Sequence, residues 1–211
     1  MKLGVLGGTF DPVHCGHLVL AKAALEQLSL ARVLFVPAGQ PPHKPDQVPS
    51  PAFHREAMIS LAIEEHENFV LSQADIDRPG PHYTADLLQI LHRAYPEAAL
   101  YFLMGGDSLA ELLTWHNPPR IAAQATLAVL RRPGWEADLE ELERAIPGIR
   151  ERWVWLKDPA LDVSATEIRR RVRKGLPISG LVPPAVAEYI YLHHLYQGHS
   201  DRSYRELFQP S

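Results

Sequence analysis

Two histidines three residues apart stand at the start of a helical segment, directly after a glycine-containing turn. Turn and histidines together span Gly7 to His17, which read Gly-Gly-Thr-Phe-Asp-Pro-Val-His-Cys-Gly-His. An apolar run at 3–6 precedes them, and residues 18–25 have helical composition, so the order is strand, loop, helix. Such a loop presents backbone N–H groups and the positive end of a helix dipole to an anion. With two further donors from His14 and His17, the segment predicts a phosphate-binding site.

Other interpretations of the two histidines are weaker. A histidine near a helix start is commonly a capping or surface residue, and two at this spacing could be half of a metal site. The single cysteine, Cys15, and the lack of a His-Glu-x-x-His motif argue against structural zinc. Neither common glycine-rich phosphate loop, Gly-x-Gly-x-x-Gly or Gly-x-x-x-x-Gly-Lys-Ser/Thr, occurs in the sequence. We therefore predict no metal ligand from the protein.

Composition indicates a globular enzyme without a general affinity for nucleic acid. The 211 residues are 46% hydrophobic and 22% charged, with a formal net charge of −4, so a phosphate site must be a local positive spot. One cysteine suits a reducing compartment, and the sequence contains neither a signal-peptide core nor a membrane span. We expect a cytoplasmic protein with no membrane or nucleic-acid partner and one domain over residues 1–196. Residues 197–211 are a tail to which we assign no role, and a homo-oligomer stays open.

Apolar runs of strand type alternate with helical patterns along the chain. This alternation favours βαβ units, and it predicts a Rossmann-like, doubly wound α/β fold with a mainly parallel sheet and helices on both faces. Ligands of such sheets bind outside the carboxyl ends of the strands, where the strand order reverses. The candidate residues follow the first, second and fourth predicted strands. The six predicted strands cover residues 3–6, 33–36, 69–71, 100–104, 126–130 and 153–156, and the helical patterns include 53–62, 84–93 and 185–195.

A second anion-binding element is predicted near the C-terminus. Ser164 and Glu167 have the spacing of a capping box at the start of a helix. The N–H groups of that helix terminus could hold an anion, and Arg169 would point toward the same place. A capping box needs no function, however, so the residues alone leave both interpretations open.

The chain resembles the nicotinate-nucleotide adenylyltransferases, which belong to the nucleotidylyltransferase superfamily with the His-x-Gly-His motif. The resemblance extends to about Tyr196, and the Pro-Pro-His-Lys and Tyr-Thr elements are the more specific to this branch. The motifs that carry it are Gly7 to His17, Pro41-Pro42-His43-Lys44, Arg55 with Met58, Arg78-Pro79-Gly80, Tyr83-Thr84, Met104 to Leu109, Trp115, Arg131 to Gly134, Val163 to Arg169, Val182-Pro183, Tyr189-Ile190 and Leu195-Tyr196.

The resemblance implies adenylyl transfer from ATP to nicotinate mononucleotide, with Mg²⁺ held mainly by the substrate phosphates. It implies that His14 and His17 contact the ATP phosphates and stabilise the transition state, and that Arg169 grips the phosphates with them. Asp107 could instead simply cap a helix, and Trp115 could be a packing residue. The implied ATP site comprises Gly7, Gly8, Thr9, Phe10, Gly105, Asp107, Ser164 and Thr166, and the implied nicotinate mononucleotide site comprises Lys44, Tyr83, Thr84 and Trp115.

Three departures from the family pattern bear on the function. Ala165 replaces the middle residue of an expected Ser-Ser-Thr, and so removes one hydroxyl near the phosphates. His82 stands where serine is commoner and His116 where an aromatic residue is frequent, both beside the implied nicotinate pocket. The alternatives are therefore an adenylyltransferase for another acceptor, such as nicotinamide mononucleotide, or a catalytically silent nucleotide-binding module. Retention of His14, His17 and Arg169 argues against the silent module.

Overall fold

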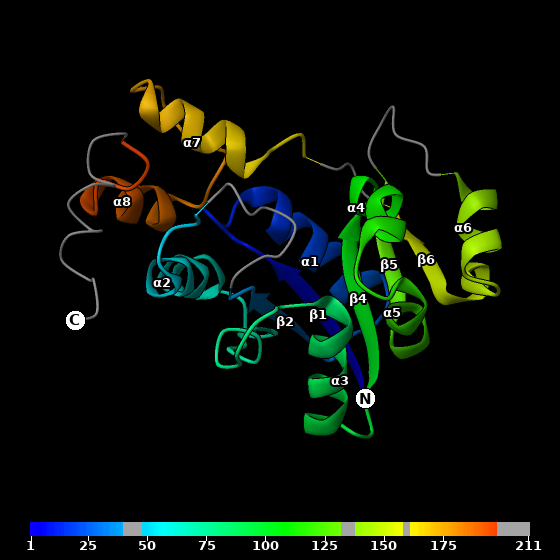
Figure 1. Ribbon diagram of the computed structural model, residues 1–211. Coiled ribbons are helices and arrows are strands. Elements are labelled where there is room, and N and C mark those ends of the chain that lie inside the picture. Colours follow the sequence, from blue (N-terminus) through cyan, green and yellow to red (C-terminus); the bar gives the residue numbers. More distant parts are fainter. Residues whose placement is uncertain (40–47, 132–137, 158–160, 198–211) are drawn as a thin grey trace.

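A parallel β-sheet with helices packed on both faces forms the protein (Figure 1). The computed structural model describes residues 1–39, 48–131, 138–157 and 161–197. The strands are Lys2–Gly8 (β1), Arg32–Pro37 (β2), Phe69–Leu71 (β3), Ala99–Gly105 (β4), Thr126–Leu130 (β5) and Trp153–Leu156 (β6). The helices are Cys15–Gln27 (α1), Ala52–Ile63 (α2), Thr84–Ala94 (α3), Gly106–Ala110 (α4), Pro118–Gln124 (α5), Leu139–Ala145 (α6), Ala165–Arg173 (α7) and Pro184–Leu192 (α8), with 3-10 turns at Glu111–Thr114 (η1) and Ile149–Arg152 (η2).

The strand order reverses between β1 and β4. The sheet runs β3-β2-β1-β4-β5-β6, and every neighbouring pair in it is parallel. From β1 the chain adds β2 and then β3 on one side, and then crosses to add β4, β5 and β6 on the other. This is the arrangement in which a crevice opens at the carboxyl ends of the two central strands. The predicted fold class is confirmed.

Alternating side chains of each central strand divide the core into two layers. Leu6 of β1 and Phe35 of β2 pack into one layer, with the buried faces of α1, α2, α7 and α8. Val5 and Leu34, their neighbours along the strands, point to the other layer, with α3, α4, α5 and α6. Successive residues of a strand face opposite sides, so each buried strand feeds both layers. Figure 1 shows α2 and α8 adjacent on their side of the sheet, far from α6.

The element boundaries follow the predicted pattern closely for the strands and less closely for the helices. Each predicted strand lies within an observed one, and three of them match it residue for residue. The last helix was predicted to continue to residue 195 but ends at Leu192, because His194 and Tyr196 have left-handed backbones with φ of 52° and 65°. Helices α5 and α6 have no counterpart among the predicted elements. No helix among the described residues is long enough and apolar enough to cross a membrane.

Candidate functional site

A pocket opens at the carboxyl ends of β1 and β4, where the strand order reverses. Gly7 and Gly105, the last or next-to-last residues of these strands, form part of its wall. Because Gly7 has no side chain, its backbone forms the surface there, and an added Cβ would make ordinary van der Waals contact with the Phe102 ring at 3.5 Å. The described residues around the pocket are Leu6, Gly7, His14, Gly16, His17, Leu20, Phe102, Leu103, Met104, Gly105, Asp107, Ser108, Trp115, Leu130 and Leu161.

The two predicted histidines form one stacked unit in this pocket. His14 is the N-cap of α1 and has extended backbone, and its N–H donates to Nδ1 of His17 at 3.1 Å. The two imidazole rings stack with centroids 3.6 Å apart and planes 23° from parallel. Because Nδ1 of His17 accepts a hydrogen bond, the ring proton resides on Nε2, which is thereby a donor. The capping arrangement thus fixes both the tautomer and the orientation of His17.

The loop between β1 and α1 presents main chain rather than side chains. Phe10 has a left-handed backbone with φ of 51°, and only 2% of its surface is exposed. Its ring packs edge-on against His17, with centroids 4.8 Å apart, and also contacts Phe35 in the core. A Cβ on Gly8 would meet the same ring at 3.4 Å. The loop is therefore anchored by Phe10, and its peptide groups are the part that can approach a ligand.

Helix α7 brings Arg169 to this loop. The Arg169 Nη1 donates to the backbone oxygen of Asp11 at 2.7 Å, and Nη2 contacts Oγ1 of Thr166 at 3.4 Å. Ser164 caps the helix as predicted, since its hydroxyl accepts from the N–H of Glu167 at 3.2 Å. The reciprocal half of the predicted capping box is wrong, because the Glu167 carboxylate binds Arg170 through two contacts of 2.6 Å.

A buried arginine on α2 joins the loops that surround the phosphate-binding motif. Arg55 is 1% exposed and uses four N–H groups on backbone carbonyls. Burial lowers the pKa of Arg55 while the nearby carboxylate of Asp11 raises it, and a guanidinium stays charged in proteins in any case. The acceptors are the oxygens of Ser50 at 3.0 Å, Thr9 at 2.9 Å, Ala38 at 2.8 Å and Gly39 at 3.2 Å.

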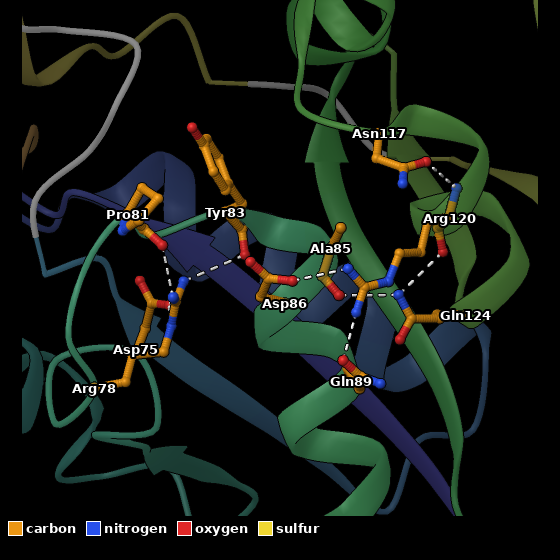
Figure 2. Close-up of polar contacts among 10 residues, drawn as sticks. All are labelled: Asp75, Arg78, Pro81, Tyr83, Ala85, Asp86, Gln89, Asn117, Arg120 and Gln124. Carbon is orange, nitrogen blue, oxygen red and sulfur yellow. Dashed lines mark hydrogen bonds and ion pairs between the residues drawn. The ribbon is translucent and has the colours of Figure 1, made fainter.

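On the other side of the pocket, the N-terminus of α3 is joined to the segment that precedes α5. The Tyr83 ring stacks on His116, with centroids 4.0 Å apart and planes 19° from parallel. Trp115, the adjacent residue, lines the pocket and meets Phe102 edge-on at 6.0 Å. Figure 2 shows how Arg120 of α5 reaches two α3 side chains, the Asp86 carboxylate at 2.8 Å and the Gln89 amide. Gln124 adds a bond from its amide to the Ala85 oxygen at 2.9 Å.

A second arginine shapes the loop that leads into α3. Arg78 binds the buried carboxylate of Asp75 at 2.8 Å and donates to the backbone oxygens of Pro81 at 2.7 Å and Tyr83 at 3.3 Å (Figure 2). The buried His82 ring lies between this loop and the end of β2, with its Nδ1 3.4 Å from Asp75 Oδ2. On its other side it meets Gly39, where a Cβ would fall within 3.0 Å of three ring atoms. A methyl group at position 39 would therefore force the His82 ring to move.

The structure places six of the predicted site residues on the wall of this pocket: Gly7, His14, His17, Gly105, Asp107 and Trp115. Asp107 lies in the first turn of α4 and lines the pocket, while the N-cap of that helix is Gly105, so the alternative role of Asp107 as a cap is wrong. Tyr83 and Thr84 stand beside Trp115 through the His116 stack and are outside the pocket wall. Lys44 lies outside the described residues. The other predicted residues outside the described pocket wall are Gly8, Thr9 and Phe10, at the end of β1 and in the loop after it, and Ser164, Thr166 and Arg169, at the N-cap of α7 and within that helix.

Sequence reasoning gave no role to Asp11 or to Arg55. Asp11 is 7% exposed, and its Oδ2 accepts from the N–H of Ser50 at 3.2 Å. The sequence did contain a signal for Arg55, because Arg55 lies on the same helical face as the apolar residues Met58 and Ile59. An arginine that is buried on such a face must have several hydrogen-bond acceptors around it. Which carbonyl groups are those acceptors could not be predicted, because they come from segments that only the tertiary fold brings together.

The chain is similar in sequence to known proteins over nearly its whole length. A family model described as cytidylyltransferase-like matches residues 5–171. A protein of Thermomicrobium roseum named probable nicotinate-nucleotide adenylyltransferase is 49% identical over 196 residues, which are 93% of this chain and 92% of the relative. A Roseiflexus protein of the same name is 44% identical over 195 residues, 92% of this chain and 98% of the relative.

Solved structures show the same fold at lower identity. The Plasmodium falciparum nicotinic acid mononucleotide adenylyltransferase complexed with NaAD superimposes with a TM-score of 0.76 at 19% identity. The match covers 92% of this chain and 97% of that one.

Replacing Arg55 by methionine is expected to destabilise the protein by about 3 kcal/mol or more, because four buried carbonyl groups lose their charged donor. For a domain of this size that corresponds to a fall of roughly 6–12 °C in the melting temperature. Differential scanning calorimetry checks the prediction, with Arg32→Met, an exposed arginine at the start of β2, as the matched control. Equal melting temperatures for the two variants would contradict it.

Gly39→Ala is expected to be destabilising only while His82 is present, because the added methyl group overlaps the imidazole. Overpacking of this kind costs about 1–3 kcal/mol. The double variant Gly39→Ala, His82→Ser should lose less free energy of unfolding than the two single variants added together, with a coupling of about 1 kcal/mol. Urea unfolding of the four proteins measures that coupling, and strict additivity would show that the two residues do not meet.

Proposed function

The chain belongs to the nicotinate-nucleotide adenylyltransferases of the cytidylyltransferase-like family, and from that premise we propose that it transfers the adenylyl group of ATP to nicotinate mononucleotide. The products are nicotinate adenine dinucleotide and pyrophosphate, a step of NAD biosynthesis. The observation that carries the proposal is one pocket, at the point of strand-order reversal, lined by His14, His17, Gly105, Asp107 and Trp115.

The reaction needs positioned positive charge more than it needs a base. The acceptor phosphate attacks the α-phosphorus of ATP in line, the bond to the bridging oxygen breaks, and pyrophosphate leaves. A phosphate monoester is already largely ionised at neutral pH, so no side chain has to remove a proton. The barrier lies in bringing two polyanions together and in the charge that develops toward the leaving group. Orientation alone can contribute on the order of 7–11 kcal/mol.

Three side chains supply that charge stabilisation in the proposal. His17 donates from Nε2, because Nδ1 is occupied by the backbone N–H of His14. His14, stacked on it at 3.6 Å, adds a second imidazole at the N-terminus of α1, where the helix dipole also favours a phosphate. Arg169 approaches from α7 beside the Asp11 carbonyl and grips the outer phosphates, with Ser164 and Thr166 at the same helix terminus.

The opposite wall of the pocket receives the pyridine ring. Trp115 offers its indole face for stacking, and the N-terminus of α3, at Tyr83 and Thr84, offers backbone N–H groups to the nicotinate carboxylate. The bonds from Arg120 and Gln124 to α3 keep these two segments at a fixed separation. Gly7, Gly8, Thr9 and Phe10 contribute main chain between the two substrates. A cytoplasmic location stays a prediction from the sequence, which leaves the oligomeric state open.

The site is suited to a magnesium ion that is bound to the triphosphate of ATP. Among the described residues, no group of three or more His, Cys, Asp or Glu side chains is arranged to hold a metal ion. Mg²⁺ commonly binds through substrate phosphates and water, so we propose that it is held by the substrate phosphates. Bound in that way it would neutralise part of the negative charge on the phosphate oxygens.

The proposal is tested by pyrophosphate release from ATP and Mg²⁺ with each mononucleotide as acceptor. We expect kcat/KM for nicotinate mononucleotide to exceed that for nicotinamide mononucleotide by roughly 100-fold, because a site built for a carboxylate leaves its donors unpaired against an amide. Equal kcat/KM values for the two acceptors would support adenylyl transfer but would contradict a pocket specific for the acid. No release with either acceptor would overturn the proposed function.

His17→Asn is expected to lower kcat by roughly 100-fold, the effect of losing one preorganised donor to a developing negative charge. Asparagine retains an acceptor for the His14 N–H, so α1 should keep its N-cap and the melting temperature should change little. The control is His66→Asn, which alters an exposed histidine between α2 and β3. A kcat for His17→Asn within threefold of the control would contradict the role of Nε2.

A further inference from the structure

The chain turns back toward the phosphate-binding loop after α8 ends. His194 and Tyr196 adopt left-handed backbones, and Leu195 between them is buried in the same core layer as α1 and α2. This turn directs the Tyr196 hydroxyl to Oδ1 of Asp11, to which it donates at 2.7 Å. The two residues are 185 positions apart in the sequence.

Asp11 accepts hydrogen bonds from two further parts of the chain, at Ser50 and at Arg169. Its Oδ2 accepts from the N–H of Ser50, and the Ser50 oxygen in turn accepts from Nε of Arg55. Its backbone oxygen accepts from Arg169 at 2.7 Å. Asp11 lies directly after Phe10 and three residues before His14. Any displacement of this residue therefore moves the loop that carries both histidines and the carbonyl against which Arg169 rests.

The hydroxyl of Tyr196 is a permanent donor in this position. Burial, together with the negative charge of Asp11, raises the pKa of Tyr196 well above its ordinary range. The phenol therefore keeps its proton across the whole pH range of an enzyme assay. A buried carboxylate is stable only when donors satisfy its oxygens. The position of the Tyr196 ring therefore determines the position of Asp11 Oδ1.

We propose that Tyr196 is a positioning residue for adenylyl transfer, whose hydroxyl fixes Asp11 and through it the placement of His14, His17 and Arg169. This inference rests on the proposed function for its kinetic consequence. It gives the end of the chain after α8 a role in the reaction, although Tyr196 itself touches no reacting atom.

The variant Tyr196→Phe tests the role by removing one oxygen atom. We expect kcat to fall by about tenfold, within the loss of up to about 100-fold that follows a shift of about 1 Å in catalytic groups. The KM values for ATP and for the acceptor should change less than twofold, because the ring and the pocket walls remain.

The matched control is Tyr189→Phe, which removes a hydroxyl from α8 that lies 2.9 Å from Nδ1 of His54. Both variants lose one partly buried hydroxyl hydrogen bond. Tyr196→Phe should lose more stability, because it removes a donor from the buried Asp11 carboxylate, so kcat is compared at a temperature at which both variants are fully folded. A purely structural role for Tyr196 would therefore give the two variants the same kcat, and that result would overturn the proposal.

A readout independent of turnover separates this inference from the proposed function. Nitrogen-15 NMR spectra of the histidine rings should show shifted His14 and His17 signals in Tyr196→Phe, and a shifted His54 signal in Tyr189→Phe. If the wild-type protein releases no pyrophosphate, the proposed function fails, and the spectra alone decide on Tyr196. Unchanged His14 and His17 signals would then overturn its positioning role, and shifted signals would support it.

Discussion

The buried guanidinium of Arg55 is the interaction on which the site depends. A charged group removed from water is tolerated only when its donors are matched by acceptors, and here the acceptors come from three separate segments. The oxygens of Thr9, of Ala38 and Gly39, and of Ser50 all point at one side chain. The loops after β1 and β2 and the residues that lead into α2 must therefore converge, whatever is bound beside them. These described segments are therefore held together beside His14 and His17, and in the proposal this preorganises the phosphate site.

The sheet supplies the second constraint, because the reversal between β1 and β4 leaves a gap above the two central strands. Among the residues around that gap, Gly7 and Gly105 present no side chain, so a ligand can approach the strand ends closely there. The His14 and His17 pair enters the gap from the first turn of α1. A helix start, a strand end and two imidazoles are thus combined at one place by topology, and their chemistry is that of anion binding.

The sequence predicted the strands and the fold class well, since each depends on local composition. It also located His14 and His17 at the start of a helix, where phosphate binding stays a prediction. The hydrogen bonds and ring contacts between distant residues could not be predicted from the sequence. Tyr196 and Asp11 have no spacing that relates them, and their contact exists only because α8 folds back against α2. The left-handed backbone of Phe10 is likewise a consequence of packing its ring under His17. Helix α5 did carry a usable signal, because its start has asparagine followed by two prolines, and the Asn117 side chain caps it.

The two proposed halves of the reaction are supported from opposite faces of the sheet. The phosphate side depends on α1, α2, α7 and α8, whose buried residues share one core layer, and it is held by Arg55 and Asp11. The proposed acceptor side depends on α3 and α5 in the other layer, and it is held by Arg78 and Arg120. The strands separate the two layers, but the two networks meet at Gly39, whose oxygen accepts from Arg55 and which packs against the His82 ring. A substitution at His82, beside the proposed acceptor site, is therefore transmitted through Gly39 and Arg55 to the loops around His14.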